Sequence, residues 1–409
     1  MTKHISEGSA ALKGHGFSRA EKSAKDDGAL APEASSVVPQ PSAVYPQPST
    51  MVRRMKDYHP PLGDRSGLRL DFNENTLACS PRVLEALRGI SAADLTRYPE
   101  REPLERRIAE HLGLDAAQVL LTNGVDEAIH VLCQAYLDAD TEVLLPVPTY
   151  SMYEVYASGT PARLVPIHAE SGFQFPLAAV LAAITPATRL IAIANPNSPT
   201  GQAVRREDLL RIVDAAPHAA VLVDEAYFHF HGETVLDLIG RAPNVIVART
   251  FSKAYGLAGL RLGTLCAAEE PMRWMRRAIS PYSVNSVALA CLAAALDDED
   301  YLRWYVAEVL AARADFESAL RRVGLPFWPS SANFVLVNIG SQHREFVEAM
   351  RSRSILVRDR SSDPGCDGCV RITIGTREQT HHAIAALEES LREIGWNLQF
   401  AHESIPRLL

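Results

Sequence analysis

The sequence predicts an α/β fold, in which a mostly parallel sheet is covered by helices on both faces. Short apolar runs recur along the chain and read as strands: residues 118–122, 142–146, 189–194, 220–224 and 244–250. Segments of helical or loop character separate these runs. Strands that are apolar on both faces and alternate with helices are typical of parallel sheets buried on both sides. We expect a large domain of this kind, followed by a smaller α+β domain.

Length and composition restrict the class of protein further. At roughly 150 residues per domain, the 409 residues allow two to three domains, and 47% hydrophobic with 22% charged residues is ordinary for a soluble protein. The net charge of −8 argues against a general nucleic-acid binder. No apolar run approaches the roughly 20 residues that span a bilayer, and no secretory signal is recognisable. We expect a cytoplasmic protein without a disulfide framework and without a membrane partner.

The chain is predicted to have five parts. Residues 1–50 are rich in Ala, Ser, Pro and Gly, and proline interrupts the stretch at 38–49 so often that neither a helix nor a central strand can form. We interpret this segment as a disordered tail. The expected order is the tail at 1–50, an arm at 51–75, the large domain at 76–290, the small C-terminal domain at 291–397 and a second tail at 398–409.

Two helices can be placed at the start of the large domain. Ser80 and Pro81 precede an apolar stripe at Val83 and Leu87, which predicts a helix with Ser80 as its N-cap. After the first predicted strand, the Asn123-Gly124 turn precedes a second apolar stripe at helical spacing. Acids in the first turn of this second helix, at positions 126 and 127, suit the helix dipole.

Polar residues follow three of the predicted strands directly. These segments are Asn195–Gly201, Asp224–Tyr227 and Arg249–Gly263. In parallel α/β sheets, ligands bind beyond the carboxyl ends of the strands. A buried acid or lysine at a strand end costs free energy unless it is paired, and a structural ion pair would explain one such end. Polar residues at the ends of three predicted strands, together with a glycine-rich turn that follows Lys253, indicate a ligand site instead.

Eight motifs carry a resemblance to a known family: Asn73–Asn75, Arg97–Glu100, Asn123–Glu127, Pro148–Tyr153, Pro196–Gly201, Asp224–Tyr227, Ser252–Arg261 and Val370–Gly375. In order and spacing, they resemble the fold type I aminotransferases that use pyridoxal 5′-phosphate (PLP). Within that class, the chain is most similar to the histidinol-phosphate aminotransferase family, from about Tyr58 to Leu391.

The resemblance implies three catalytic residues. Lys253 is the amine that forms a Schiff base with the PLP aldehyde and then moves the substrate proton. Asp224 faces the ring nitrogen and favours its protonated form. Tyr227 donates a hydrogen bond to the ring oxygen. A further aromatic residue, Tyr150, stacks on the face of the ring.

The PLP phosphate is expected at the start of the second helix. There the backbone N–H groups of Gly124, Val125 and Asp126 would bind it, as helix N-termini commonly bind phosphate. The resemblance adds cofactor contacts from after the last predicted strand: Thr250, Ser252 and Arg261. It also implies that Tyr98 reaches this phosphate from a neighbouring subunit, so that a homodimer shares its active sites.

One position departs from the family pattern. The family usually has Asn directly before Pro-Thr-Gly, bonded to the ring oxygen, whereas this chain has Ser198 there, preceded by Asn197. Three alternatives remain at this point: the Ser198 hydroxyl makes the contact, Asn197 makes it, or a water molecule intervenes.

Four residues are expected to bind substrate. By resemblance, Arg371 grips a carboxylate and Arg358 is a second anion-binding arginine, which together suit a doubly charged phosphate. Tyr58 in the arm and Asn75 complete the set. The implied reaction is transamination between glutamate and imidazole-acetol phosphate, which yields histidinol phosphate in histidine biosynthesis.

Several alternatives share most of these motifs. An aromatic-amino-acid aminotransferase and a threonine-phosphate decarboxylase use the same fold, and a PLP-binding protein without catalytic activity is a third alternative. The intact Lys253 and Asp224 argue against the last of these. A metal site is not expected, because the lone pair Cys366 and Cys369 has no further ligands at suitable spacing.

Overall fold

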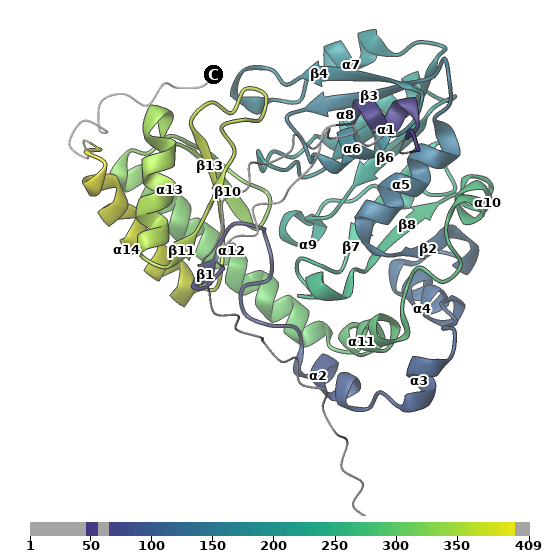
Figure 1. Cartoon of the computed structure of the whole chain (residues 1–409), viewed down its shortest axis with the longest axis horizontal. Coiled ribbons are helices and arrows are strands. Elements are labelled where there is room, and N and C mark those ends of the chain that lie inside the picture. Colours follow the sequence, from purple (N-terminus) through teal and green to yellow (C-terminus); the bar gives the residue numbers. More distant parts are fainter. Residues whose placement is uncertain (1–45, 56–64, 397–409) are drawn as a thin grey trace, which may run out of the picture. The chain divides into compact units, whose positions relative to one another are not determined.

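The computed structural model describes residues 46–55 and 65–396 (Figure 1). In these ranges the chain forms a seven-stranded sheet, a four-stranded sheet and a two-stranded one. The two predicted tails lie largely outside these ranges, and Tyr58 lies outside them entirely. From Pro48 onward, the chain forms one compact unit. No helix in the described ranges has both the length and the apolar character needed to cross a membrane.

The larger sheet confirms the predicted α/β class. Its seven strands run in the order β2-β8-β7-β6-β5-β3-β4. All are parallel except β8, which is antiparallel to both neighbours. The strands are β2 (Val119–Thr122), β3 (Glu142–Val147), β4 (Arg163–His168), β5 (Thr188–Ala194), β6 (Ala220–Asp224), β7 (Val245–Thr250) and β8 (Gly263–Ala267). The five predicted runs all belong to it.

Alternate residues of the buried strands fill two cores, one on each face of this sheet. In β6, for example, Val221 and Val223 pack on one face, whereas Leu222 packs on the other. Three helices cover the Leu222 face: α5 (Gly124–Tyr136), α6 (Met152–Ser158) and α10 (Glu269–Ala278). The opposite core includes residues of α2 (Pro81–Arg88), α4 (Glu102–Leu112), α8 (Arg206–Ala215) and α11 (Ser286–Leu296).

The smaller sheet is antiparallel and lies in the C-terminal part of the chain. Its four strands run in the order β12-β13-β10-β9. They are β9 (Phe327–Trp328), β10 (Phe334–Asn338), β12 (Arg358–Asp359) and β13 (Cys369–Thr373). The core beside them includes residues of three helices: α12 (Glu299–Val323), α13 (His343–Ser352) and α14 (Arg377–Glu393).

A short segment links the start of the described chain to this C-terminal part. Strand β1 (Leu68–Arg69) pairs in parallel with β11 (Ile355–Leu356). The Thr373 N–H then donates to the Leu70 carbonyl at 2.9 Å, which extends the contact to the end of β13. Residues 71–75, which follow directly, are therefore held beside the smaller sheet.

The carboxyl ends of β5, β6 and β7 meet at one edge of the larger sheet. The Asn195 N–H donates to the Asp224 carbonyl at 2.8 Å, and the Glu225 N–H donates to the Ala248 carbonyl at 2.8 Å. The three polar segments that follow these strands are therefore neighbours in space, as the sequence predicted.

Candidate active site

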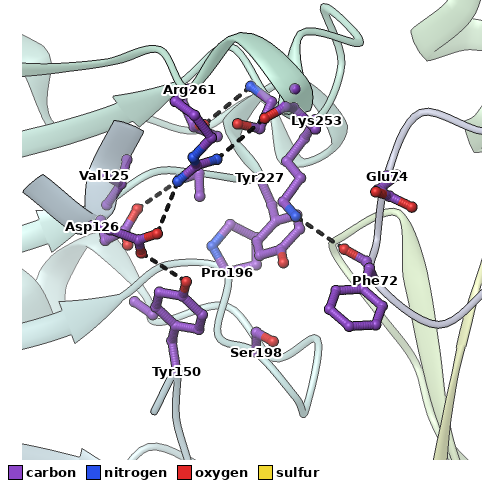
Figure 2. Close-up of a pocket in the computed structure, with 17 residues that line it drawn as sticks. Phe72, Glu74, Val125, Asp126, Tyr150, Pro196, Ser198, Tyr227, Lys253 and Arg261 are labelled. Atoms are coloured by element: carbon purple, nitrogen blue, oxygen red, sulfur yellow. Dashed lines mark hydrogen bonds and ion pairs between the residues drawn. The ribbon is translucent and has the colours of Figure 1, made fainter. Parts of the chain in front are cut away.

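A pocket of about 430 Å³ lies at this edge of the larger sheet (Figure 2). Many of the predicted cofactor residues line it: Val125, Asp126, Tyr150, Ser198, Asp224, Tyr227, Thr250, Ser252, Lys253 and Arg261. Phe72 and Glu74 also line it, although the sequence did not predict a role for either residue. The structure thus brings residues from all three strand ends to one pocket.

Lys253 reaches into the pocket from the turn after β7. Its Nζ donates a hydrogen bond to the Phe72 carbonyl at 3.1 Å and lies 5.8 Å from the centre of the Tyr227 ring. Gly256 shapes the turn, because it has a φ of 72°, and a Cβ there would come within 3.0 Å of the Ala78 carbonyl oxygen. The amine is thus presented on a turn whose backbone favours glycine.

Asp224 ends β6 and is almost completely buried. Its Oδ2 accepts a hydrogen bond from the Tyr153 hydroxyl at 2.6 Å, and its Oδ1 accepts one from the Ala226 N–H at 2.9 Å. Burial raises the pKa of Asp224 to about 6, although both hydrogen bonds oppose that rise. Among the described residues, no cation pairs with this carboxylate. A positive charge placed beside it would favour its ionised form.

Tyr227 is held by a residue that the sequence analysis did not select. The Asn73 Nδ2 donates to the Tyr227 hydroxyl at 2.8 Å. Asn73 has a φ of 55°, a left-handed conformation that Asn tolerates better than most residues. Its backbone N–H donates to the Thr373 hydroxyl oxygen at 3.0 Å. The available signal was the position of Asn73 at the start of the Asn73–Asn75 motif.

The N-terminus of α5 and Arg261 form a positively polarised corner. The Arg261 Nη2 lies 2.8 Å from Asp126 Oδ2, and the Tyr150 hydroxyl donates to Asp126 Oδ1 at 2.7 Å (Figure 2). A Cβ at Gly124 would lie 2.7 Å from this guanidinium nitrogen. Because Gly124 also has a φ of 78°, its backbone conformation and the close approach of arginine both favour glycine at this position. The combination suits a phosphate group.

Two further predicted cofactor residues line the pocket beside Lys253. The Ser252 N–H donates to the Thr250 hydroxyl oxygen at 3.1 Å, and the Thr250 hydroxyl lies 3.4 Å from the Leu262 carbonyl oxygen. These contacts fix the backbone just before the lysine. Both hydroxyl groups belong to residues on the pocket wall.

Ser198 and Asn197 have different surroundings. The Ser198 Oγ accepts a hydrogen bond from Arg371 Nη1 at 3.0 Å, and Ser198 lines the pocket. The Asn197 side chain instead donates to the Pro148 carbonyl at 2.9 Å and accepts from the Thr149 hydroxyl at 2.8 Å. Asn197 therefore joins the loop after β5 to the loop after β3. Ser198 is the residue of the two that lines the pocket.

The two predicted substrate arginines are cross-strand neighbours in the smaller sheet. Arg358 in β12 lies opposite Arg371 in β13. The buried Arg371 donates from Nη2 to the Asp71 carbonyl at 2.8 Å, and its Nε has no hydrogen-bond partner in the described ranges. Burial and two neighbouring arginines lower the pKa of Arg371 to about 10. A bound anion would stabilise this charge.

Two other predicted residues lie differently. Asn75 does not line the pocket: its Nδ2 lies 3.3 Å from the Ala254 carbonyl, and its Oδ1 accepts from the Leu77 N–H at 3.0 Å. Tyr98 is 78% exposed and stacks on Tyr282 with ring centres 4.4 Å apart. It does not line the pocket of its own chain.

No cluster of His, Cys, Asp or Glu in residues 46–55 and 65–396 is arranged to hold a metal ion. Cys366 and Cys369 are buried free thiols beside Phe173 and Leu336. Cys366 lies just before β13 and Cys369 is the first residue of that strand, so the two thiols belong to a small buried apolar cluster.

The fold and the pocket together define a class of protein. PLP has an aldehyde, a ring nitrogen that binds a proton, and a phosphate. The pocket offers an amine at Lys253, a buried carboxylate without a cation at Asp224, and an arginine at a helix N-terminus. These groups fit PLP, and the parallel sheet that presents them is that of the fold type I PLP-dependent transferases.

Comparisons with known proteins agree. The family model "Aminotransferase class I and II" matches residues 65–387. A histidinol-phosphate aminotransferase of Symbiobacterium thermophilum is 36% identical over 84% of this chain and 98% of that protein. One of a Geobacillus strain is 35% identical over 80% of this chain and 90% of that protein.

A solved structure gives the same result. The histidinol-phosphate aminotransferase of Sinorhizobium meliloti, in complex with PLP, aligns with a TM-score of 0.79 and 26% identity, over 86% of this chain and 99% of that chain. This chain belongs to the class I and II aminotransferases. It is a PLP-dependent aminotransferase, as the sequence predicted.

Proposed function

We propose that this enzyme is a histidinol-phosphate aminotransferase, which exchanges an amino group between histidinol phosphate and 2-oxoglutarate in histidine biosynthesis. The observation that carries the proposal is the pair of arginines, Arg358 and Arg371, facing each other across β12 and β13. Arg371 bonds to Ser198 of the pocket wall at 3.0 Å. Two guanidinium groups together match the two charges of a phosphate monoester better than the single charge of a carboxylate.

The proposed roles of the cofactor residues follow from their positions. Bound PLP supplies an electron sink and a temporary carrier for the amino group. Lys253 anchors the cofactor through Nζ and, when released from it, moves the proton at the substrate carbon. Asp224 holds the proton on the ring nitrogen. Tyr227, oriented by Asn73, donates to the ring oxygen, and Tyr150 covers the ring face.

The phosphate of PLP is proposed to bind where the α5 N-terminus meets Arg261. The backbone N–H groups of Gly124, Val125 and Asp126 and the hydroxyl groups of Thr250 and Ser252 supply hydrogen bonds there. Because Arg261 is already paired with Asp126 at 2.8 Å, its guanidinium is oriented before the phosphate arrives.

The substrate side must accept two kinds of anion. We infer that Arg371 binds the carboxylate of glutamate in one half-reaction and that Arg358 and Arg371 bind the phosphate of the other substrate. The buried Nε of Arg371 leaves a donor available for either anion. We retain Asn75 and Tyr58 as further proposed substrate contacts, although Asn75 is bonded mainly to backbone groups.

The proposal includes a homodimer. Large apolar side chains are exposed on α2, on α3 (Ala92–Thr96) and just beyond them: Leu84, Leu87, Leu95, Tyr98 and Tyr282. An exposed apolar group of this kind is typical of a protein interface. A second copy of the chain would cover it and bring Tyr98 to the PLP phosphate of its partner.

Two further assignments remain predictions: the cytoplasmic location, and the division into a large domain at 76–290 and a small one at 291–397. The proposed boundary between residues 290 and 291 falls inside α11, whose second half packs in the core beside the larger sheet, and the next gap between helices is at Asp297 and Asp298. The smaller sheet and its three helices fall within the second range.

Substrate kinetics test the proposed function. The purified PLP-loaded enzyme is given 2-oxoglutarate and one amine at a time: histidinol phosphate, phenylalanine or threonine phosphate. We expect kcat/KM for histidinol phosphate to exceed that for phenylalanine by about 10–100-fold, the value of a charge-assisted phosphate contact. A preference for phenylalanine would contradict the phosphate site. Release of carbon dioxide from threonine phosphate as the main reaction would contradict transamination.

A further inference from the structure

We propose that Tyr153 is a positioning residue for catalysis, which fixes the plane of the Asp224 carboxylate and keeps it ionised opposite the ring nitrogen of PLP. This inference rests on the proposed role of Asp224. It concerns a residue that touches neither PLP nor substrate in the proposed site, because Tyr153 does not line the pocket. Its hydroxyl group acts through Asp224 alone.

The two hydrogen bonds on Asp224 come from different elements. The Tyr153 hydroxyl, in the first turn of α6, donates to Oδ2 at 2.6 Å. The Ala226 N–H, in the loop after β6, donates to Oδ1 at 2.9 Å. With one donor on each oxygen, the carboxylate cannot rotate without breaking a bond. Asp224 lines the pocket, so the orientation of its free lone pairs toward a ligand is set by these two donors.

Tyr153 is packed so that its hydroxyl has little freedom. The side chain is 3% exposed. Its ring meets the Tyr150 ring edge to face, with centres 6.0 Å apart and planes at 89°. Tyr150 is itself held at its hydroxyl by Asp126. The stacking residue and the donor to Asp224 are therefore three positions apart on one rigid piece of chain.

The charges around Asp224 explain why a donor is needed there. Burial is the largest influence on Asp224 and favours the protonated carboxyl, and the neighbouring carboxylates of Asp126 and Glu225 act in the same direction. Both neighbours are paired, Asp126 with Arg261 and Glu225 with Arg249, each at 2.8 Å. The Tyr153 hydrogen bond is the largest influence in the opposite direction and lowers the pKa of Asp224. Without it, the carboxyl would keep its proton to a higher pH.

The variant Tyr153→Phe removes this hydroxyl and retains the ring. We expect PLP to dissociate from the holoenzyme with a Kd raised about tenfold, the loss of one hydrogen bond to a charged group. We also expect the acid limb of kcat to move up by roughly one pH unit. This rate constant is measured for the half-reaction in which glutamate aminates bound PLP. The change in the absorbance of the cofactor follows the reaction. The KM for glutamate should change less than about twofold, because Arg371 is untouched.

Tyr305→Phe is the matched control. Tyr305 is also fully buried, and its hydroxyl accepts a hydrogen bond from the Thr76 N–H at 3.4 Å. It lines no part of the pocket. Both variants lose a buried hydroxyl, so both are expected to lose some thermal stability. Only Tyr153→Phe should change the PLP affinity and the acid limb. Equal behaviour of the two variants would overturn the inference.

A second pair of measurements separates positioning from packing. In an Asp224→Asn background, Tyr153→Phe should have no further effect on PLP affinity, because Tyr153 acts only through the Asp224 carboxylate, which this background lacks. Additive losses in the double variant would overturn the inference. The readouts use only PLP and glutamate, so they hold even if histidinol phosphate proves a poor substrate. An Asp224→Asn enzyme with normal PLP affinity and an unchanged acid limb would also end the case for Tyr153.

Discussion

The two sides of the pocket are built in different ways. Asp224 and Lys253 follow adjacent strands of the larger sheet, so the register of β6 against β7 sets their separation. Arg371 instead lies on the smaller sheet and meets the pocket through Ser198 and the Asp71 carbonyl. The cofactor side is thus fixed by the pairing of strands within one sheet. The position of the substrate side depends instead on contacts between the smaller sheet and other parts of the chain.

This difference suggests that the two sides of the pocket serve different functions. Groups held by one sheet suit chemistry that every member of the class shares, because their geometry tolerates little change. Groups brought in from a second sheet suit specificity, because a change there leaves the cofactor contacts intact. The predictions below test whether changes on the two sides have separable effects.

The largest effect is expected on the cofactor side, at Lys253. Lys253→Ala removes the only amine among the described residues that line the pocket, and kcat should fall by about 10⁴-fold or more. The variant should also fail to develop the absorbance that the wild type shows when PLP attaches to a lysine. Near-normal turnover of glutamate by this folded variant, checked by circular dichroism, would assign the chemistry to another group.

Asp224 should make the stability of the PLP-free enzyme depend on pH. Since its pKa is raised to about 6 in the folded chain, the unfolded chain loses this proton first, and stability falls as pH rises. Relative to Asp224→Asn, the wild type should lose up to about 3 kcal/mol of unfolding free energy between pH ~4 and pH ~7. Urea denaturation at both pH values measures this. A difference that stays constant with pH would contradict the unpaired state of the carboxylate.

On the substrate side, Arg358→Ala should weaken one class of substrate only. The loss of a charge-assisted contact lowers kcat/KM for histidinol phosphate by about 10–100-fold, whereas glutamate, held by Arg371, should change less than about threefold. Arg344→Ala on the exposed face of α13 is the matched control and should leave both values unchanged. Equal losses for both substrates would remove the distinction between the two sides.

The smallest expected effect concerns the shared site. Mixing inactive Lys253→Ala with a Tyr98→Ala enzyme of reduced activity, followed by subunit exchange, creates hybrid dimers in which one of the two sites is intact. At random exchange, about half of the dimers are hybrids, so recovery of up to about a quarter of wild-type activity is expected. Activity no higher than the sum of the unmixed variants would exclude Tyr98 from the partner's site.

The sequence predicted the cofactor side far better than the substrate side. Strands that are buried on both faces form continuous apolar runs, and the residues at or just beyond their carboxyl ends, such as Asp224 and Lys253, then share one edge. Edge strand β4 was not predicted, because the exposed Pro166 interrupts its apolar pattern and the exposed Arg163 and His168 lie at its two ends. Strand β8 was not predicted either: it directly follows the glycine-rich turn, and its first residue, Gly263, was assigned to the polar segment Arg249–Gly263.

The missed residues have a common physical reason. Asn73 contacts Tyr227 and Thr373, which are 154 and 300 positions away, and Tyr153 contacts Asp224, which is 71 positions away. No local pattern encodes such pairs, because they depend on where whole elements pack. The sequence also left the role of Asn197 open. The folded structure was needed to show that its side chain bonds to Pro148 and Thr149.

Three consecutive residues join the two sides of the pocket. The Asp71 carbonyl accepts from Arg371, the Phe72 carbonyl accepts from Lys253, and the Asn73 side chain donates to Tyr227. Two of these three contacts use main-chain oxygens, which survive every side-chain replacement. Alanine scanning would therefore not detect the roles of the Asp71 and Phe72 carbonyl groups as hydrogen-bond acceptors. Replacing these peptide bonds with esters, which weakens the carbonyl as an acceptor and keeps the side chain, is the modification that would reveal their contribution.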